Sequence, residues 1–218
     1  MSGNVQQKPR TRKPRGQGAS RRGEILAAAS RIFLEEGVEH ATMRRIAASV
    51  GVCTTALYVY FSDKDAILQA IAEATFAELL ETLEASQRGD VSPPDRFRAG
   101  LRAYVQFGLS RPDAYRLTFL SPGSRPPAKR SDSARPMQAA DRSFEILQRG
   151  VEEMMAAGLF RPGPSEPLAE AIWACLHGVT ALLLDQATHL NTPAERLIEQ
   201  VLDIVMSGCG GPIEIKQK

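Results

Sequence analysis

The stretch Thr42-Met-Arg-Arg-Ile-Ala-Ala-Ser-Val-Gly-Val-Cys-Thr-Thr-Ala-Leu-Tyr-Val-Tyr-Phe-Ser-Asp-Lys64 decides the fold of this chain. Its spacing predicts two short helices around a tight turn. Thr42 suits the N-cap of the first helix, because its hydroxyl can accept a hydrogen bond from a free N–H of the first turn. Met43, Ile46 and Val50 then recur at helical spacing and mark a buried face. Gly51 ends this helix, since glycine adopts the left-handed conformation without a Cβ clash.

The second of these helices is predicted to begin near Cys53 or Thr54. Leu57 and Phe61 lie four residues apart and form a narrow inward stripe, so most of the helix surface stays outside the core. That surface carries small hydroxyls and two tyrosines, and no acidic residue occurs before Asp63. Such a helix suits entry into the major groove of DNA, whose edges are lined by phosphates. The pattern is that of a helix-turn-helix.

At these residues the chain resembles the tetracycline-repressor (TetR) family of transcriptional regulators. The family's motif runs roughly Thr-x-x-x-Ile-Ala, then Gly-Val-Ser-x-x-x-Leu-Tyr-x-Tyr/His-Phe-x-x-Lys. It appears here as Thr42, Ile46, Ala47, Gly51, Val52, Leu57, Tyr58, Tyr60, Phe61 and Lys64. Cys53 stands where the family usually has serine, which changes one of the positions that commonly contact bases.

The resemblance implies a DNA-contacting role for residues of both helices. Tyr58, Tyr60 and Lys64 match the family's phosphate contacts, and Arg44 occupies a position that often reads a base, where a guanidinium can pair with guanine O6 and N7. The full set expected to bind DNA is Arg44, Thr54, Thr55, Tyr58, Tyr60, Lys64, Thr42 and Arg45. The alternatives are a solvated arginine at 44 or 45 and threonines that only begin a helix.

Charge is unevenly distributed along the 218 residues. Residues 1–66 hold 11 Lys/Arg against 6 Asp/Glu, a net of +5, whereas residues 67–218 hold 16 against 19, a net of −3. A basic end that coincides with a helix-turn-helix is the pattern expected of a protein that binds a polyanion.

The cysteines and the hydrophobic segments indicate a cytoplasmic protein. Cys53, Cys175 and Cys209 are odd in number and widely spaced, which predicts neither a disulfide framework nor a zinc site. The N-terminus is basic and polar, unlike a signal peptide, and no apolar run is expected to reach the length of a membrane span. The sequence has no catalytic triad, no metal-ligand cluster and no phosphate-binding glycine loop, so we expect no enzyme, no metal and no cofactor.

We divide the chain into four parts. Residues 1–19 form a basic N-terminal arm whose composition predicts disorder; it is either a solubilising tail or an arm that follows phosphates or a minor groove. Residues 20–66 form the DNA-binding domain, with a first helix from Arg21 to Glu36. Residues 67–208 form a ligand-binding and dimerisation domain, and residues 209–218 form a flexible tail.

The larger domain is predicted to contain six helices, which makes the whole chain all-α: a three-helix head and a six-helix body. Ser62 with Asp65 resembles a capping box that opens a helix as far as Gln87, and Thr192 with Glu195 resembles another that opens the last helix. A Pro/Ser/Arg-rich loop is expected over 121–136, followed by a helix over 137–157.

The last two helices are predicted to form a homodimer interface. From Ala171 to Leu184 no residue is charged and apolar residues occupy every face, so a second subunit is the simplest cover for the side that the chain's own core leaves open. The pair resembles the family's dimerisation helices. In addition, Trp173-Ala-Cys-Leu-His177-Gly178 resembles a Trp–His–Gly signature of one group of C-terminal domains in the family.

The resemblance also implies a pocket for a small effector, which we place among the fifth to eighth helices. An apolar or aromatic effector fits the composition. The alternative for each aromatic residue is a place in the core, and for His177 a partnered core or interface histidine. The candidate lining residues are Phe97, Tyr104, Phe107, Tyr115, Phe119, Phe144, Met154, Trp173 and His177.

The sequence therefore predicts a repressor that binds a palindromic double-stranded operator as a homodimer and is released by a small molecule. Two alternatives stay open: a DNA-binding regulator without a small-molecule ligand, and a helical binding module that has lost operator recognition.

Overall fold

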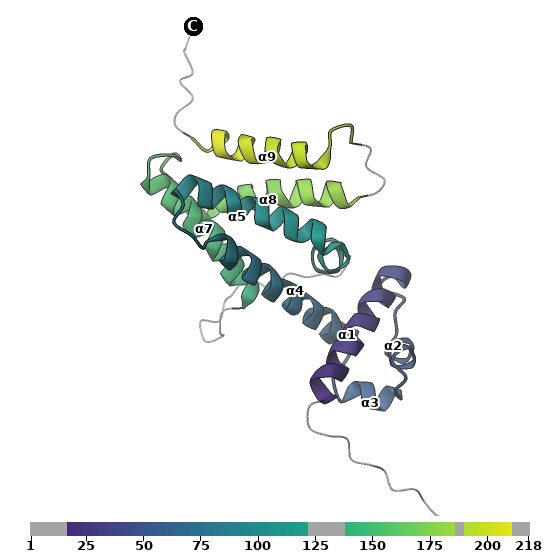
Figure 1. Ribbon diagram of the computed structural model, residues 1–218. Coiled ribbons are helices and arrows are strands. Elements are labelled where there is room, and N and C mark those ends of the chain that lie inside the picture. The colour runs from purple at the N-terminus through teal and green to yellow at the C-terminus, as the bar shows by residue number, and fades with distance from the viewer. Residues whose placement is uncertain (1–16, 122–137, 186–189, 211–218) are drawn as a thin grey trace, which may run out of the picture. The chain divides into compact units, whose positions relative to one another are not determined.

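The chain folds into helices that form two compact units, residues 1–67 and 68–218 (Figure 1). The computed structural model describes residues 17–121, 138–185 and 190–210, and in these ranges it contains no strand. Residues 1–16 of the predicted basic arm, the loop over 121–136 apart from Ser121, and most of the predicted tail lie outside the described residues. Residues 17–19, which we assigned to the arm, instead begin the first helix. The all-α prediction is confirmed.

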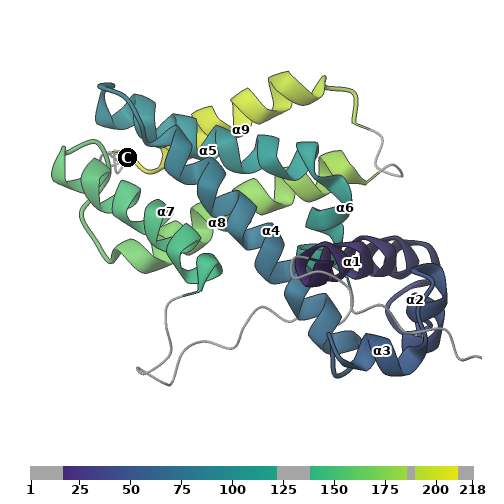
Figure 2. The ribbon, with the colours of Figure 1, turned by 60° about the horizontal axis from the view of Figure 1, so that its bottom comes forward.

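The first unit holds three helices: α1 (Gln17–Glu36), α2 (Met43–Ser49) and α3 (Thr54–Tyr58). Gly37, at φ +83°, ends α1 in the left-handed conformation that glycine adopts without strain. Figure 2 shows α1 beside α2. Ile25, Ala29, Ile32 and Phe33 of α1 are buried, as their i, i+4, i+7, i+8 spacing predicts, and form the small core on which α2 and α3 pack.

The helix α4 (Lys64–Ser86) begins at the end of the first unit. Its N-terminus is capped by Asp63, whose Oδ1 accepts a hydrogen bond from the Ala66 N–H at 2.7 Å. The predicted Ser62–Asp65 capping box is wrong, because the Ser62 hydroxyl instead donates to the Asp63 carboxylate. These hydrogen bonds, led by the one from the Ala66 N–H, lower the pKa of the Asp63 carboxyl group.

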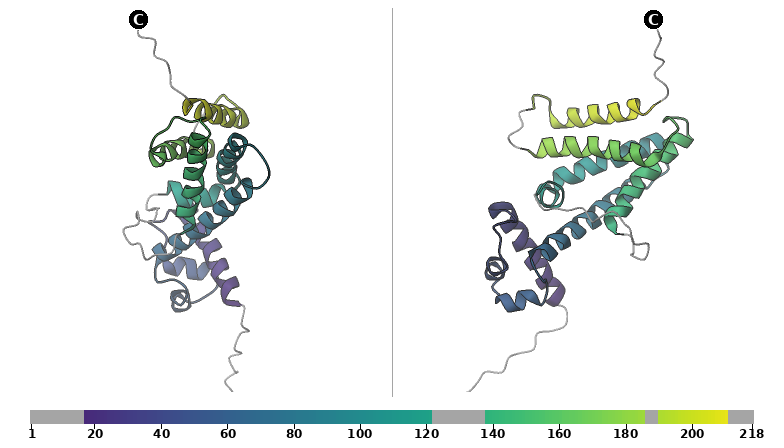
Figure 3. Two further views of the ribbon diagram at one scale, coloured as in Figure 1. Left: turned by 90° about the vertical axis from the view of Figure 1, so that its left-hand side faces the viewer. Right: turned by 180° about the vertical axis from the view of Figure 1, so that it is seen from behind.

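The second unit continues with α5 (Pro93–Ser110), α6 (Pro112–Tyr115), the π-helical turn η1 (Arg116–Leu120), α7 (Ala139–Ala156), α8 (Ser165–Leu184) and α9 (Ala194–Gly208). Helices α5, α7 and α8 pack against one another around one hydrophobic core, and α9 packs on α5 and α8. Figure 3 shows α8 and α9 lying side by side. The α4 side chains Leu79 and Leu83 join this core.

One sequence prediction about the last two helices is wrong. Pro193 is the N-cap residue of α9 and makes no side-chain cap, so the predicted Thr192–Glu195 capping box does not form. The helix α8 begins at Ser165, earlier than the uncharged stretch from Ala171, and its 20 residues are long and apolar enough to cross a membrane by length and composition alone. Core helices of soluble proteins pass the same test, and α8 packs against α5, α7 and α9.

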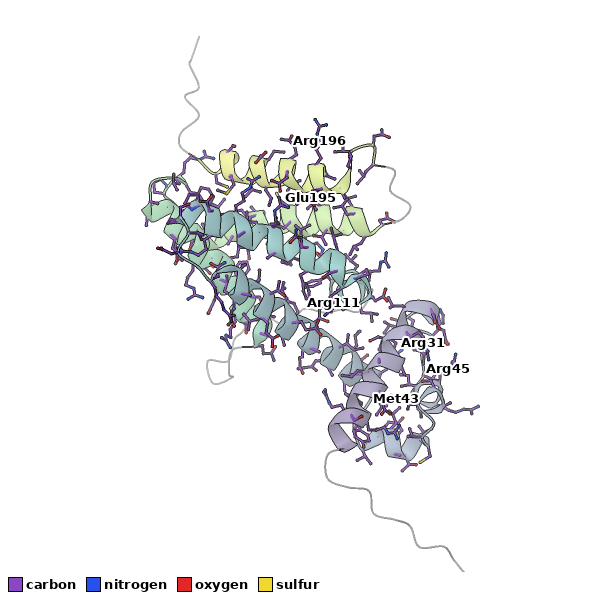
Figure 4. All side chains as sticks on the ribbon, viewed as in Figure 1. Arg31, Met43, Arg45, Arg111, Glu195 and Arg196 are labelled. Carbon is purple, nitrogen blue, oxygen red and sulfur yellow. The ribbon has the colours of Figure 1, made fainter. Side chains whose placement is uncertain are left out.

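Charged pairs join α5 to α9 along one side of the second unit. The guanidinium of Arg98 binds Glu199 and Asp203 at 2.7 Å each, and Arg102 binds Glu195 and Glu199. Figure 4 labels Glu195 near the beginning of α9. These contacts lie on one side of α9.

Candidate DNA-binding surface and effector cavity

The turn between α2 and α3 has the geometry of a helix-turn-helix. Thr42 caps α2, with its Oγ1 accepting from the Arg45 N–H at 3.2 Å, as predicted. Gly51 adopts φ +68°, which allows the Val52 N–H to reach back to the Ala47 carbonyl at 3.0 Å. A non-glycine residue at 51 would be strained in this conformation.

The buried and exposed sides of α3 divide as its spacing predicts. Leu57 is fully buried and Phe61 nearly so, which fixes the helix on the small core. On the outside, Tyr58 is 53% exposed and Val59 81% exposed, and Tyr60 is exposed as well. Neither α2 nor α3 contains an acidic residue. The outer side of α3 is therefore an uncharged surface of hydroxyls, rings and one valine, suited to close approach by a phosphate-lined groove.

The threonines and arginines of the predicted set lie in different surroundings. Thr55 is exposed, whereas Thr54 is half-buried. Arg44 is exposed on α2, while the Arg45 Nε donates to Glu36 Oε1 of α1 at 2.9 Å. Figure 4 labels Arg45 on α2. Arg44 is thus the more available of the two guanidinium groups.

Lys64 makes internal contacts in this structure. Its Nζ donates to the Val38 carbonyl at 2.9 Å and to the Glu39 carbonyl at 3.2 Å, in the connection between α1 and α2. Its ammonium group therefore stabilises that connection, and its predicted phosphate contact stays a prediction.

Two exposed residues of the first unit were not in the predicted DNA-binding set. Val59 is the most exposed of the large apolar side chains among the described residues, and its position opposite the Leu57–Phe61 stripe was already visible in the sequence. Arg22 of α1 lies over the Phe61 ring with its Cζ 5.0 Å from the ring centroid. That contact joins residues far apart in the sequence, so local spacing gives no signal for it.

Without the N-terminal arm the first unit has no excess of positive charge. Residues 20–66 hold six Lys/Arg and six Asp/Glu, so the net of +5 over residues 1–66 comes from the five basic residues of the arm, in a stretch without acids. The electrostatic attraction that the sequence assigns to the DNA-binding domain is therefore concentrated in the arm.

The second unit contains a cavity of about 560 Å³ between α4, η1, α5, α7 and α8. Of the nine predicted pocket residues, five line it: Phe97, Tyr104, Phe119, Phe144 and Trp173. The contribution of α4 was missed, because we placed the pocket among the fifth to eighth helices. Its wall residues are Phe76, Leu79 and Leu83, which the sequence marks only as apolar positions at helical spacing.

The other four predicted pocket residues are not among the lining residues. Phe107 and Met154 are buried core residues. Tyr115 is fully buried behind the wall, and His177 is half-buried beside it, with its ring 5.6 Å from that of Trp173. Tyr115 and His177 nevertheless reach the cavity indirectly, through a chain of hydrogen bonds.

That chain runs from the cavity wall into α8. Trp173 Nε1 donates to the Tyr104 hydroxyl at 3.1 Å, the Tyr104 and Tyr115 hydroxyls are 3.1 Å apart, and the Tyr115 hydroxyl lies 2.7 Å from His177 Nδ1. Burial raises the pKa of both tyrosines and lowers the pKa of His177. With His177 neutral and accepting at Nδ1, each hydroxyl donates to the next group toward the histidine.

An apolar strip remains exposed along α8 and α9. On α8 the strip consists of the small exposed residues Ala171, Ala174 and Cys175, with Leu182 beyond them; on α9, Ile204 is 60% exposed. Small side chains allow another helix to approach closely. The three cysteines are free thiols.

A three-helix head with a helix-turn-helix and a separate helical unit with a cavity together define a class of ligand-responsive DNA-binding regulators. Residues 25–71 match the family described as bacterial regulatory proteins of the tetR family, and residues 97–205 match the tetracyclin repressor-like C-terminal domain. The chain belongs to the TetR family.

Curated relatives include both activators and repressors. The chain is 32% identical over 99 residues to the transcriptional activator FasR of Mycolicibacterium smegmatis, a match that covers 45% of each chain. It is 28% identical over 155 residues to the transcriptional repressor KstR2 of Mycobacterium tuberculosis, covering 67% of this chain and 72% of KstR2. The match thus spans less than half of FasR, and likewise 43% of the repressor AcnR of Corynebacterium efficiens.

Solved structures share the fold over nearly the whole chain. A protein of unknown function from Rhodococcus sp. RHA1 aligns with a TM-score of 0.70 at 25% identity, over 92% of this chain and 100% of that one. A TetR/AcrR-family regulator from Thermobifida fusca aligns with a TM-score of 0.64 at 26% identity, over 87% of this chain and 98% of that one.

Proposed function

We propose that this chain is a transcriptional repressor that binds a palindromic operator as a homodimer and releases it when a small apolar or aromatic molecule enters the cavity of the second unit. The observation that carries the proposal is the exposed, acid-free surface of α3 held by the buried Leu57 and Phe61. The family and its repressors KstR2 and AcnR support repression. Like its family, the protein is a regulator rather than an enzyme, and we place it in the cytoplasm.

The dimer is assigned to α8 and α9. The exposed small residues of α8 form an apolar strip together with Ile204 of α9, and such a strip is poorly solvated by water. In a twofold dimer the same strip of a second copy would cover it. In a twofold dimer, two copies of α3 must meet successive major grooves on one side of the duplex, about 34–36 Å apart. A ligand that prefers a form of the second unit with another spacing weakens operator binding by its differential affinity.

A gel-shift titration with the DNA flanking the protein's own gene tests operator recognition, and repeating it with candidate effectors tests release. Retarded DNA that small molecules release supports the proposal. Retarded DNA that no member of a broad apolar library releases favours a regulator without a small-molecule ligand. Failure to bind that DNA, or any sequence selected from a random pool at low salt, favours a helical module that has lost operator recognition.

Single substitutions separate base reading from backbone binding. Arg44→Ala should cost about 1–3 kcal/mol of discrimination at one base pair and relax preference there. Tyr58→Phe removes a hydroxyl and should weaken binding to many sequences alike, by about 1 kcal/mol. Arg31→Ala, which removes an exposed arginine of α1 outside the helix-turn-helix, is the matched control. A uniform loss for both Arg44→Ala and Tyr58→Phe would contradict these roles.

A further inference from the structure

Three consecutive large apolar side chains, Tyr58, Val59 and Tyr60, are exposed at the end of α3. Among the exposed large apolar side chains of the described residues, only these three follow one another directly in the sequence. Single exposed apolar residues are ordinary on a soluble protein, but a consecutive run is poorly solvated and indicates a contact surface. The tyrosine hydroxyls can bind phosphate oxygens, whereas Val59 has no polar atom and needs an apolar partner.

Val59 lies on the outermost side of α3. Leu57 is fully buried and Phe61 nearly so, and these two side chains fix the inner side of the helix. Thr55 and Val59, four residues apart, are both exposed and form a row opposite that inner side. The second helix of a helix-turn-helix lies in the major groove of DNA. The row of Thr55 and Val59 therefore faces the base edges when α3 enters the groove.

The backbone holds Val59 in a defined position. Its φ of −67° and ψ of −27° are helical, and the N–H groups of Tyr60 and Phe61 both donate to the Leu57 carbonyl, at 2.9 and 3.2 Å. Valine is branched at Cβ, and its single side-chain torsion is restricted on a helical backbone. Such a side chain loses little conformational entropy when it packs against another group. The exposed methyl groups of Val59 are thus a preformed apolar contact.

The C5-methyl group of thymine is the apolar group that base pairs present in the major groove. The other features of this code are hydrogen-bond donors and acceptors, and a valine that covered one of them would remove water without replacing its hydrogen bond. No acidic residue occurs between Thr42 and Ser62, so this segment carries no charge that repels the phosphates beside the groove. A valine in this position therefore favours thymine over the other bases.

We propose that Val59 is a specificity-determining residue, whose methyl groups pack against the C5-methyl group of one thymine in each half-site of the operator. This inference rests on the proposed function, because it requires α3 of each subunit to enter the major groove. It deepens that function by naming the base and the chemical group that one side chain recognises. The contact adds sequence preference without a hydrogen bond, beside the base contact expected of Arg44.

Replacing thymine by deoxyuridine tests the contact, because it removes the C5-methyl group and keeps the hydrogen-bonding groups of the base. The full-length protein first selects its operator from a random pool, and each thymine of the half-sites is then replaced in turn. Fluorescence anisotropy measures the dissociation constants. Loss of the contacted methyl group should weaken binding about fourfold in one half-site and about 15-fold when both half-sites are changed.

Substitutions at Val59 identify the side chain that makes the contact. Val59→Ala should bind the thymine and uracil operators with nearly equal affinity, whereas Val59→Ile keeps a branched apolar side chain and should keep the preference for thymine. Val91→Ala is the matched control, because Val91 is an exposed valine between α4 and α5, and it should leave the ratio of the two affinities unchanged. Val59 is exposed, so Val59→Ala should melt at nearly the same temperature as the parent protein.

The outcomes separate this inference from the proposed function. A uracil penalty that persists in Val59→Ala, or a Val59→Ala variant that loses equal affinity for both operators, overturns the thymine contact. A selected half-site in which no thymine methyl group affects binding also overturns it, while the binding itself would still support an operator-binding regulator. Failure to bind any selected DNA at low salt would refute the operator-binding function, and the thymine contact with it.

Discussion

Replacing Tyr115 by phenylalanine removes one hydroxyl from the centre of the hydrogen-bond chain and should destabilise the second unit. The side chain is fully buried, and its hydroxyl lies 3.1 Å from that of Tyr104 and 2.7 Å from His177 Nδ1. Two buried hydrogen bonds at about 1 kcal/mol each give a loss of about 2 kcal/mol. For a chain of this size that loss lowers the melting temperature by about 4–8 °C, measurable by thermal or urea denaturation at fixed protein concentration.

The same substitution should change what the cavity binds. In the arrangement in which His177 Nδ1 accepts from Tyr115 and Tyr115 accepts from Tyr104, loss of the Tyr115 oxygen leaves the Tyr104 hydroxyl free to donate into the cavity, while Trp173 continues to donate to it. Triphenylphosphine oxide, a neutral and strong acceptor, should therefore bind several-fold to about tenfold more tightly to Tyr115→Phe than to the parent protein. Trp173 fluorescence and calorimetry measure the change.

Tyr60→Phe is the matched control, because it removes the hydroxyl of an exposed ring in the other unit. It should alter stability by no more than about 0.5 kcal/mol and leave probe binding unchanged. An unchanged melting temperature together with unchanged triphenylphosphine oxide binding in Tyr115→Phe would refute the hydrogen-bond chain.

Three further outcomes follow from charges and exposed surfaces. Residues 1–16 carry five basic residues and no acid. When log affinity for operator DNA is plotted against log salt concentration, deleting these residues should reduce the steepness of the line by up to about 9 per dimer, as measured by fluorescence anisotropy. An unchanged slope would show that the arm makes no phosphate contact. Burial lowers the folded-state pKa of His177 below its ordinary 6.5, so between these two pKa values the unfolded chain binds a proton that the folded chain excludes. The free energy of unfolding should therefore fall as pH decreases from 6.5 toward the folded-state pKa. In urea denaturation at a series of pH values, His177→Gln should flatten this pH dependence. Ile204→Glu places a charge in the exposed apolar strip and should weaken dimerisation about 100-fold or more, as measured by analytical ultracentrifugation. The control Gln200→Glu, at another exposed position of α9, should not weaken it. Equal dimer stability in both variants would place the interface elsewhere.

The helix-turn-helix was predictable because its determinants are local. Thr42 caps the helix that begins one residue later, Gly51 provides the positive φ of the turn, and Leu57 and Phe61 face inward at a spacing of four. Each of these depends on residues within a few positions of one another, where backbone sterics and helix periodicity act directly. The capping-box pattern was less reliable. Ser62 and Thr192 both have an acidic residue three positions later, but Asp63 caps α4 and no side chain caps α9.

The cavity depended on the tertiary structure. Phe97 and Phe107 are both buried aromatics of α5, but only Phe97 lines the cavity. Whether a buried side chain borders empty space depends on how helices distant in the sequence pack around it. Glu166 and Glu170 line the cavity although they precede the uncharged stretch from Ala171, because α8 begins earlier, at Ser165.

The amino-acid sequence by itself determined the family, the all-α class and the position of the DNA-reading helix, because these follow from short-range spacing, capping and turn geometry. Only the tertiary structure decided that α4 forms a wall of the cavity, that the Tyr104–Tyr115–His177 chain connects that wall to α8, and that the cavity edge is acidic. The hydrogen-bond chain alone joins residues 11 to 69 positions apart, whose proximity is fixed by helix packing and not by the pattern of any one segment.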